Sequence, residues 1–289
     1  MVTPTAKRLI ADYFMQTYKM KERKACRLIN VAVSSKRYRA RGKACDQLIK
    51  KQLISLAATH IRYGYRRLTA CLHQTGAQVN HKKVYRLYKE AHLKYAQKKR
   101  QKIKYVQCSK ISLATKMNEV WGLDFVSDTL TDKRTFRCFN VIDICSRFSI
   151  AIEPGVSLPS LAIINILDQA IHQYGKPQSL IVDNGPEFRS QIFRDWAQKH
   201  QIRLHFIEPG KPTQNAYIES FNGKFRDECL NQHWFSSMQE AKSVIAQWRE
   251  HYNHSRPHSA LKYLPPIAFI NQNQKNTENN CQNQKLILK

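Results

Sequence analysis

Apolar residues recur three or four positions apart along the first third of the chain, a spacing typical of helices that bury one face. From residue 118 onward, short apolar runs alternate with helical patterns. Runs at 119–128, 134–148 and 149–156 predict three consecutive strands. The later elements are strands at 179–185 and 202–210 and helices at 159–174, 191–200, 215–231 and 238–252. This order predicts an α/β protein in which helices flank a mixed sheet.

Residues 21–41 have the pattern of two short helices around a tight turn. Ser34 and Ser35 are predicted to cap the second helix, which then presents Lys36, Arg37 and Arg39. This arrangement is typical of a helix-turn-helix that contacts DNA. The alternative is an ordinary helical hairpin with a solvated basic face.

A second helical group follows. The segment 46–60 predicts an amphipathic helix with Leu48, Leu53, Leu56 and Ala57 inward. A helix over 66–74 ends at Gly76, and one over 81–93 places Val84, Leu87 and Tyr88 on one face. A second helix-turn-helix would turn Lys82, Lys83 and Arg86 toward phosphates, whereas the alternative is again a solvated basic face.

The charge of the chain is uneven. Lys and Arg number 48 and Asp and Glu 21, which gives a formal net charge of +27. Residues 1–110 hold 28 basic and 4 acidic residues, against 20 and 17 in the remainder. This imbalance argues against a small neutral ligand and favours a polyanion, most often nucleic acid. The alternative is a basic surface without a partner.

Composition predicts four segments: a helix-turn-helix DNA-binding region at 1–95, a basic linker at 96–114, an α/β region with another task at 115–270 and a disordered tail at 271–289. The linker contains Lys98, Lys99 and Arg100. Ten of the 19 tail residues are Asn or Gln, a composition that buries little surface.

The eight cysteines form no CxxC pair. The sequence has neither a run long enough to cross a bilayer nor a signal-peptide pattern, so we expect free thiols in a reducing, cytosolic compartment.

Three acids stand out by position. Asp124 lies within an apolar strand, Asp183 follows another, and Glu219 lies near the start of a helix. Buried carboxylates are costly unless their charge is offset, and hard oxygen ligands suit Mg²⁺ or Mn²⁺. Two such ions at one site support phosphoryl transfer. The alternative is three unrelated acids.

The strings WGLDFVSD, LIVDNGPEF, FIEPGKPTQNAYIESFNGKFRDECL and NHSRPHSALKYLPP occur here in that order. They resemble the DDE transposases of bacterial insertion sequences, whose core is similar to retroviral integrases, and specifically the product of the second of two overlapping reading frames. The 35 residues between Asp183 and Glu219 match this subclass. The strings KACRLINVAVSSKRYR and RYGYRRL…VNHKKVYRLY resemble the helix-turn-helix region of the family.

The resemblance implies that 115–270 is an integrase catalytic core with an RNase H-like fold, in which Asp124, Asp183 and Glu219 ligate two Mg²⁺ or Mn²⁺ ions. It also implies a bacterial cytoplasm and association with the nucleoid. It implies cleavage at the ends of the element with water, then strand transfer by the freed 3′-hydroxyl. The expected partners are terminal inverted repeats, target DNA, further copies of the chain and a first-frame protein or fusion, with no membrane. The alternatives are a catalytically silent DNA-binding regulator and an RNase H-like nuclease.

Further candidates surround the acids. Arg226 shares a helix face with Glu219, and Lys224 lies partly off that face. Asn184 is expected to contact either DNA or the metal shell, and Glu187 is expected to fix the loop. Asp128 is a rival to Asp124 as a metal ligand. Residues 251, 254 and 258 are histidines without a nearby cysteine, which argues against zinc, and the four tryptophans are expected in the core. The residues expected to bind DNA are Lys36, Arg37, Arg39, Arg66, Arg67, Lys82, Lys83, Arg86, Lys98, Lys99, Arg100, Lys211, Asn184, Lys224 and Arg226.

Overall fold

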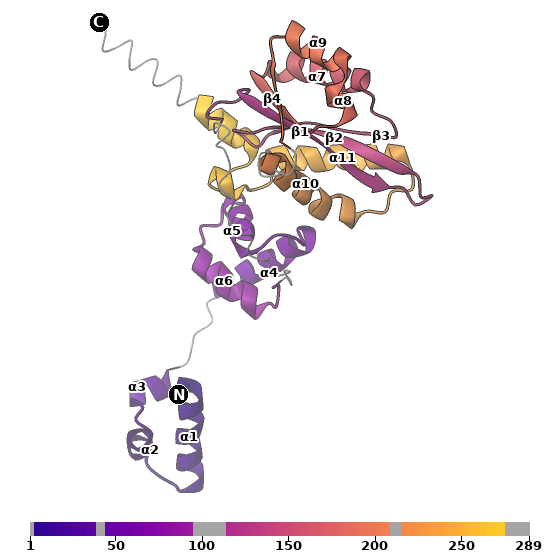
Figure 1. Ribbon diagram of the computed structural model, residues 1–289. Coiled ribbons are helices and arrows are strands. Elements are labelled where there is room, and N and C mark those ends of the chain that lie inside the picture. The colour runs from indigo at the N-terminus through magenta and orange to yellow at the C-terminus, as the bar shows by residue number, and fades with distance from the viewer. Residues whose placement is uncertain (1–2, 39–43, 95–113, 209–214, 275–289) are drawn as a thin grey trace, which may run out of the picture. The chain divides into compact units, whose positions relative to one another are not determined.

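A computed structural model describes residues 3–38, 44–94, 114–208 and 215–274. The chain divides into two compact units, Met1–Lys51 and Gln52–Lys289. The helices and strands of both units are drawn in Figure 1. Among the described residues, no helix combines the length and the apolar character needed to cross a bilayer.

The first unit is helical. It contains α1 (Pro4–Thr17), α2 (Glu22–Leu28), α3 (Val33–Arg37) and the start of α4 (Ala44–Thr59). The helix α1, which the apolar spacing does not predict, begins at Thr3, whose hydroxyl accepts from the Ala6 N–H at 3.3 Å. The helix α3 begins one residue before Ser34, with Ala32 at its N-cap, so the predicted serine cap is wrong.

Two of the expected DNA contacts in the first unit are engaged in ion pairs. Lys36 lies 3.1 Å from Asp12 and 3.4 Å from Glu22. Arg37 donates from Nε to Glu22 over 3.0 Å, and 68% of its side chain is exposed. The helix pair at 21–37 is therefore held together by its basic residues, and DNA contact by Lys36 and Arg37 stays a prediction.

The second unit begins with helices. In α4, Ile49 and Leu53 are buried, but Leu48 is 65% exposed, which corrects its predicted inward position. Ile49 and Leu53, four residues apart, define the buried stripe of the helix instead. The helix α5 (Tyr65–Gln74) is followed by Gly76, whose φ of +88° requires glycine.

The helix α6 (His81–Glu90) is capped by the Asn80 side chain, which accepts from the Lys82 N–H at 2.9 Å. Val84, Leu87 and Tyr88 are buried, as predicted.

A five-stranded sheet in the order β3-β2-β1-β4-β5 forms the remainder of this unit. Its strands are β1 (Val120–Thr129), β2 (Thr135–Asp143), β3 (Ser149–Gly155), β4 (Ser179–Val182) and β5 (Arg203–Phe206). The strands β1, β2 and β3 pair antiparallel, whereas β1, β4 and β5 pair in parallel. This mixed sheet, flanked by helices, confirms the predicted RNase H-like fold class.

Helices cover both faces of the sheet (Figure 1). They are α7 (Ser160–Tyr174), α8 (Pro186–Arg189) and α9 (Gln191–Lys199) on one face, and α10 (Ala216–Glu228) and α11 (Met238–His254) on the other. The short helices η2 (Leu230–Gln232) and η3 (Ser259–Leu261) flank α11. Leu123 and Leu167 belong to the core on the first face, whereas Val126 and Phe221 belong to the core on the second. Successive residues of β1 therefore point to opposite layers.

Three of the four tryptophans are buried, but Trp234 is 89% exposed, so its predicted place in the core is wrong. Trp234 precedes Phe235, which is 1% exposed. Neighbouring side chains in an extended segment point in opposite directions, so burial of Phe235 turns Trp234 outward.

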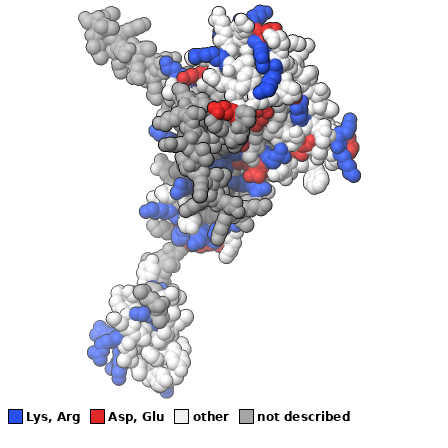
Figure 2. Space-filling view, in the orientation of Figure 1, with Lys and Arg blue, Asp and Glu red and all other residues white. Residues whose placement is uncertain are grey.

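On the face shown in Figure 2, acidic and basic side chains are interspersed over the part that contains the sheet. The basic linker predicted at 96–114 lies almost entirely outside the described residues, and the tail beyond residue 274 lies outside them completely. Residues 266–274 are helical. The four predicted segment boundaries stay predictions.

Candidate active site

The two aspartates occupy matching positions on neighbouring parallel strands. The last paired residues of β1 and β4 are Gly122 and Ile181, and Asp124 and Asp183 each follow two residues later. Because strand side chains alternate with a period of two, each aspartate is placed on the same face of the sheet as the residue two positions before it. That face is covered by α10, since Ile218 of α10 packs against Gly122.

The helix α10 packs on the face of β1 that carries Gly122. A Cβ at Gly122 would lie 3.5 Å from the Ile218 Cβ, an ordinary van der Waals contact. Glu219 follows Ile218 and lies in the first turn of α10. The packing of α10 therefore brings the third acid to the layer that covers this face of β1.

The charges of the other two acids act on Asp124. Burial raises the pKa of Asp124 to about 6, and the charges of Asp183 and Glu219 act in the same direction. Hydrogen bonds from the Phe125 N–H and from Asn222 oppose this rise. Burial also raises the pKa of Glu219. Asp183 and Glu219 are thus near enough to disfavour the ionised form of Asp124.

Two asparagines orient Asp124. Asn140 of β2 is paired with Asp124 across the sheet and donates its Nδ2 to Oδ1 of Asn222 over 2.7 Å. Asn222 in turn donates its own Nδ2 to Oδ2 of Asp124, also over 2.7 Å. Sequence reasoning missed both residues, although Asn222 lies three positions after Glu219 and hence on the same side of α10.

The loop after β4 brings two acids together around a glycine. Oδ1 of Asp183 accepts from the Gly185 N–H at 2.8 Å. A Cβ at Gly185 would lie 2.9 Å from Oδ1 of Asp183 and 3.1 Å from Oε2 of Glu187. Glu187 pairs with Arg137 of β2 at 2.8 Å, and this links the loop to the sheet.

The oxygen atoms of these carboxylates are of the chemical kind that binds a divalent cation. Carboxylate oxygens are the ligands that Mg²⁺ and Mn²⁺ prefer, and a cation would offset the repulsion that raises the pKa of Asp124. Within the described ranges, however, no three side chains of His, Cys, Asp or Glu are grouped in a way that would hold a metal ion. The charges of Asp183 and Glu219 thus act on Asp124, but the three side chains do not form a complete set of metal ligands.

Two further acids near the strands, Asp128 and Asp143, accept hydrogen bonds from their own neighbourhoods. Oδ1 of Asp128 accepts from the Thr129 N–H at 2.8 Å, near the hairpin end of β1. Asp143 is fully buried and accepts from the N–H and hydroxyl of Ser146 and from the Asn118 N–H. Asp143 therefore holds the turn after β2.

Several expected DNA contacts lie close to the acids. Arg226 donates to the Ser127 carbonyl over 3.1 Å, three residues after Asp124 on β1. Asn184 donates to the Ile207 carbonyl at 2.7 Å and accepts from Arg189 at 2.9 Å, so its amide is engaged within the protein. DNA contact by Arg226 and Asn184 stays a prediction.

The other basic candidates are dispersed. Arg66 and Lys82 are exposed, and Arg86 forms an ion pair with Glu90 at 2.9 Å. Arg67 pairs with Glu228 at 3.2 Å. Lys83 is partly buried. The candidates that lie outside the described residues are Arg39, Lys98, Lys99, Arg100 and Lys211.

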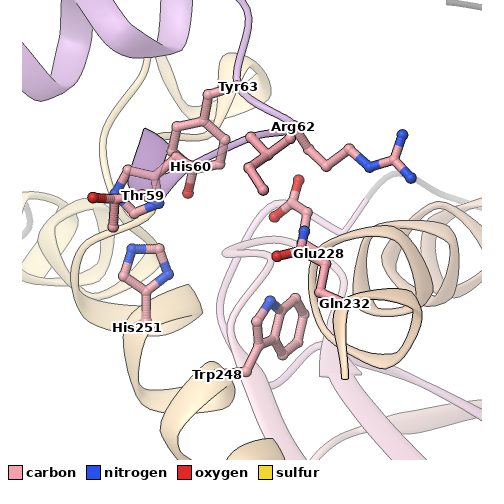
Figure 3. A pocket seen from close by; sticks show the side chains of 9 residues that line it. Thr59, His60, Arg62, Tyr63, Glu228, Gln232, Trp248 and His251 are labelled. Carbon is pink, nitrogen blue, oxygen red and sulfur yellow. The ribbon is translucent and has the colours of Figure 1, made fainter. Parts of the chain in front are cut away.

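The three histidines near the C-terminus have separate surroundings. His251 stacks on His60 with ring centroids 5.1 Å apart, beside a small cavity of about 50 Å³ (Figure 3). His254 lies 3.1 Å from Glu250. His258 is buried beside Arg256, and burial, reinforced by that charge, lowers its pKa to about 2.

Comparison with known proteins agrees with this geometry. Two models described as integrase core domain match residues 114–212 and 200–266, and a model described as HTH-like domain matches residues 44–101. The chain is 42% identical to an uncharacterized 39.2 kDa protein of insertion element IS476 from Xanthomonas euvesicatoria, over 93% of this chain and 78% of that protein. The chain belongs to the insertion-element transposases with an integrase core.

Other members of this transposase family also match. An uncharacterized 31.7 kDa protein of insertion element IS407 from Burkholderia multivorans is 42% identical over 86% of this chain and 90% of its own length. The putative transposase InsK of element IS150 from Escherichia coli is 31% identical over 73% and 78%. Family membership confirms the predicted DDE polynucleotidyl transferase class. DNA is the partner that both kinds of matched model imply, and the integrase core implies a divalent metal.

Proposed function

We propose that Asp124, Asp183 and Glu219 form the catalytic site of this transposase and together hold two divalent cations, Mg²⁺ or Mn²⁺. The observation that carries the proposal is geometric: Asp124 and Asp183 follow neighbouring parallel strands at matching positions, and Glu219 lies in the first turn of the helix that packs on that face. The negative charges of Asp183 and Glu219 also favour protonation of Asp124. A cation, when bound, offsets this charge and stabilises the negative charge that develops on the phosphodiester.

The reaction that suits this site has two transfers. In the first, water attacks a phosphorus at the end of the element, the bond to the 3′ oxygen breaks, and a 3′-hydroxyl is released. In the second, that hydroxyl attacks a phosphorus of the target strand and displaces another 3′ oxygen. The carboxylates would hold the cations, which would position the reacting groups, and Asn222 keeps the Asp124 carboxylate turned toward α10.

The proposal also assigns roles to the helices at the start of the chain and to partner molecules. The helices within 1–95, through their exposed basic residues, are proposed to bind the terminal repeats, while the core at 115–270 cuts and joins. We propose that copies of the chain act together on paired ends, with a first-frame protein as partner or fusion, in the bacterial cytoplasm. The five described cysteines that are free, Cys26, Cys71, Cys138, Cys145 and Cys229, are consistent with a reducing compartment.

The test mixes the purified full chain with labelled DNA bearing the ends of its own element, in Mg²⁺, in Mn²⁺ or in EDTA. Metal-dependent cleavage is expected in the wild type and should be lost in Asp183→Asn. Asp195→Asn, at an exposed acid on α9, is the matched control and should cut normally.

Each alternative gives a distinct result. Cleavage that survives Asp183→Asn contradicts the assignment of the site. Tight binding of end DNA without cleavage in any metal favours a silent regulator, whereas cleavage confined to an RNA–DNA hybrid favours a nuclease.

A further inference from the structure

A second cavity, of about 280 Å³, lies beside α10 in the second unit. Lys224 of α10 lines it, five residues after Glu219 and hence about 140° around the helix axis. The other basic lining residues are Arg67 of α5, Arg147 of the turn between β2 and β3, and Arg256 after α11. Four segments distant in sequence therefore supply cations to one hollow.

The cavity carries excess positive charge. Its lining holds these four cations and, among the described residues, no carboxylate. Two of the cations share one carboxylate: Glu228 accepts two hydrogen bonds of 2.6 Å from Arg256 and one of 3.2 Å from Arg67. A single carboxylate thus serves two of the four cations. His258 adds no charge, because burial keeps it neutral.

Arg147 presents an unused donor. Its backbone has a φ of +61°, a left-handed conformation that is uncommon for a residue other than glycine. Its guanidinium carbon lies 3.8 Å from the centroid of the Tyr217 ring on α10. Its Nη1 is buried and has no hydrogen-bond partner in the described part of the chain. Such a buried donor is costly unless an acceptor reaches it.

The pKa of Lys224 reflects the positive charge of the other cations in the cavity. Its Nζ lies 3.1 Å from the Ser220 hydroxyl. Burial, followed by the charges of Arg256 and Arg67, lowers its pKa to about 8. A lysine in this state gains from any anion that enters the cavity.

We propose that this cavity binds one phosphate group of a DNA backbone, with Arg147, Lys224 and Arg67 as its donors. Guanidinium and ammonium groups are the usual protein ligands of phosphate oxygens. The choice of DNA as the source of the phosphate rests on the proposed function. Since Tyr217 and Lys224 flank Glu219 on α10, this contact fixes the DNA strand relative to the helix that carries the third acid.

The first test measures the affinity of the full chain for duplex DNA by fluorescence anisotropy at several salt concentrations. Each phosphate contact contributes about one unit to the slope of log K against log salt. Lys224→Gln is expected to reduce the magnitude of this slope by about one. Lys242→Gln, the same charge change at an exposed position of α11, is expected to leave it unchanged.

Equal slopes for wild type and Lys224→Gln would overturn the proposal, as would an equal loss in Lys242→Gln. Circular dichroism establishes that each variant is folded, and Lys224→Arg should restore the slope. Asp183→Asn should keep the wild-type slope. The phosphate contact and the cleavage chemistry can therefore fail independently.

The second test distinguishes the sources of phosphate. In a chain labelled with ¹³C-lysine, the Lys224 ¹³Cε resonance, assigned with Lys224→Arg, is titrated alone, with inorganic phosphate and with a short duplex. We expect the duplex to raise the titration midpoint. No change with either ligand, or a change with inorganic phosphate alone, would overturn a DNA-phosphate site.

Discussion

Asn222 donates its Nδ2 to Oδ2 of Asp124 over 2.7 Å and thereby ties α10 to the central strand at the first acid of the site. Its own Oδ1 is occupied by Asn140, so the amide has one orientation. The acid of the strand is thus held by a residue of the same helix that carries Glu219.

Removing that amide should weaken catalysis more than folding. Asn222→Ala is expected to lower metal-dependent cleavage by about 10–100-fold, the range typical when the hydrogen-bond partner of a metal ligand is lost. Cleavage of end DNA at several Mg²⁺ concentrations measures the loss. Asn231→Ala, at an exposed position of η2, is the control. Wild-type cleavage in Asn222→Ala would show that Asp124 needs no such support.

Stability should depend on pH through Asp124. Its folded pKa, about 6, lies above the ordinary value of 3.8, so the folded state binds the proton more tightly than the unfolded state. The stabilising contribution of this proton is therefore present at pH 4 and lost as pH rises to about 6 in the wild type, and Asp124→Asn lacks it at every pH. Between pH 4 and 6, the free energy of unfolding of Asp124→Asn should therefore rise relative to that of the wild type by about 3 kcal/mol at most.

Urea unfolding followed by tryptophan fluorescence measures this, because all four tryptophans lie in the second unit. Mg²⁺ should raise the stability of the wild type at pH 7.5 and not that of Asp124→Asn. Parallel pH profiles for the two proteins would contradict the interpretation of Asp124 as a destabilised carboxylate.

A methyl group at Gly185 should disturb the site directly. Because its Cβ would lie 2.9 Å from Oδ1 of Asp183, Gly185→Ala must displace that carboxylate. Displacements of this size in catalytic groups cost about 100-fold in rate. Gly223→Ala is the control, since a Cβ at this position of α10 would meet no atom within 4 Å. This variant should cut normally. Its free energy of unfolding should rise by about 0.5–1 kcal/mol, because alanine is more favourable than glycine inside a helix.

The pair of Glu228 and Arg256 should be essential to the fold. Arg256 is 1% exposed, and Glu228→Gln leaves its charge buried without a counterion. We expect a loss of about 3 kcal/mol in the free energy of unfolding, measured with urea. Glu250→Gln removes an exposed partner of His254 and should change it by less than about 0.5 kcal/mol.

The sequence was a good guide wherever local pattern decides the outcome. The apolar run around Asp124 and the short run before Asp183 predicted strands, because short apolar runs bounded by turn residues are typical of buried strands. The buried residues Val84, Leu87 and Tyr88 followed from helical spacing alone. Leu48 and Trp234 were misplaced because a neighbour, Ile49 or Phe235, occupies the inward position.

Sequence reasoning failed where the partner lies far along the chain. Asn140 and Asn222 are 82 residues apart, and Arg147 meets Lys224 only through the packing of α10 on the sheet. No periodicity links such positions. The conformation of Arg147, with φ of +61°, also depends on a turn that its residue type does not favour.

The acids enter the site from three segments, and the last of them, Glu219, arrives with α10. A translation product that stops before α10 keeps the HTH-like region at 44–101 and both aspartates but has no third acid. The catalytic site that we propose is therefore complete only after synthesis has passed α10, whereas both aspartates are already present in the shorter product.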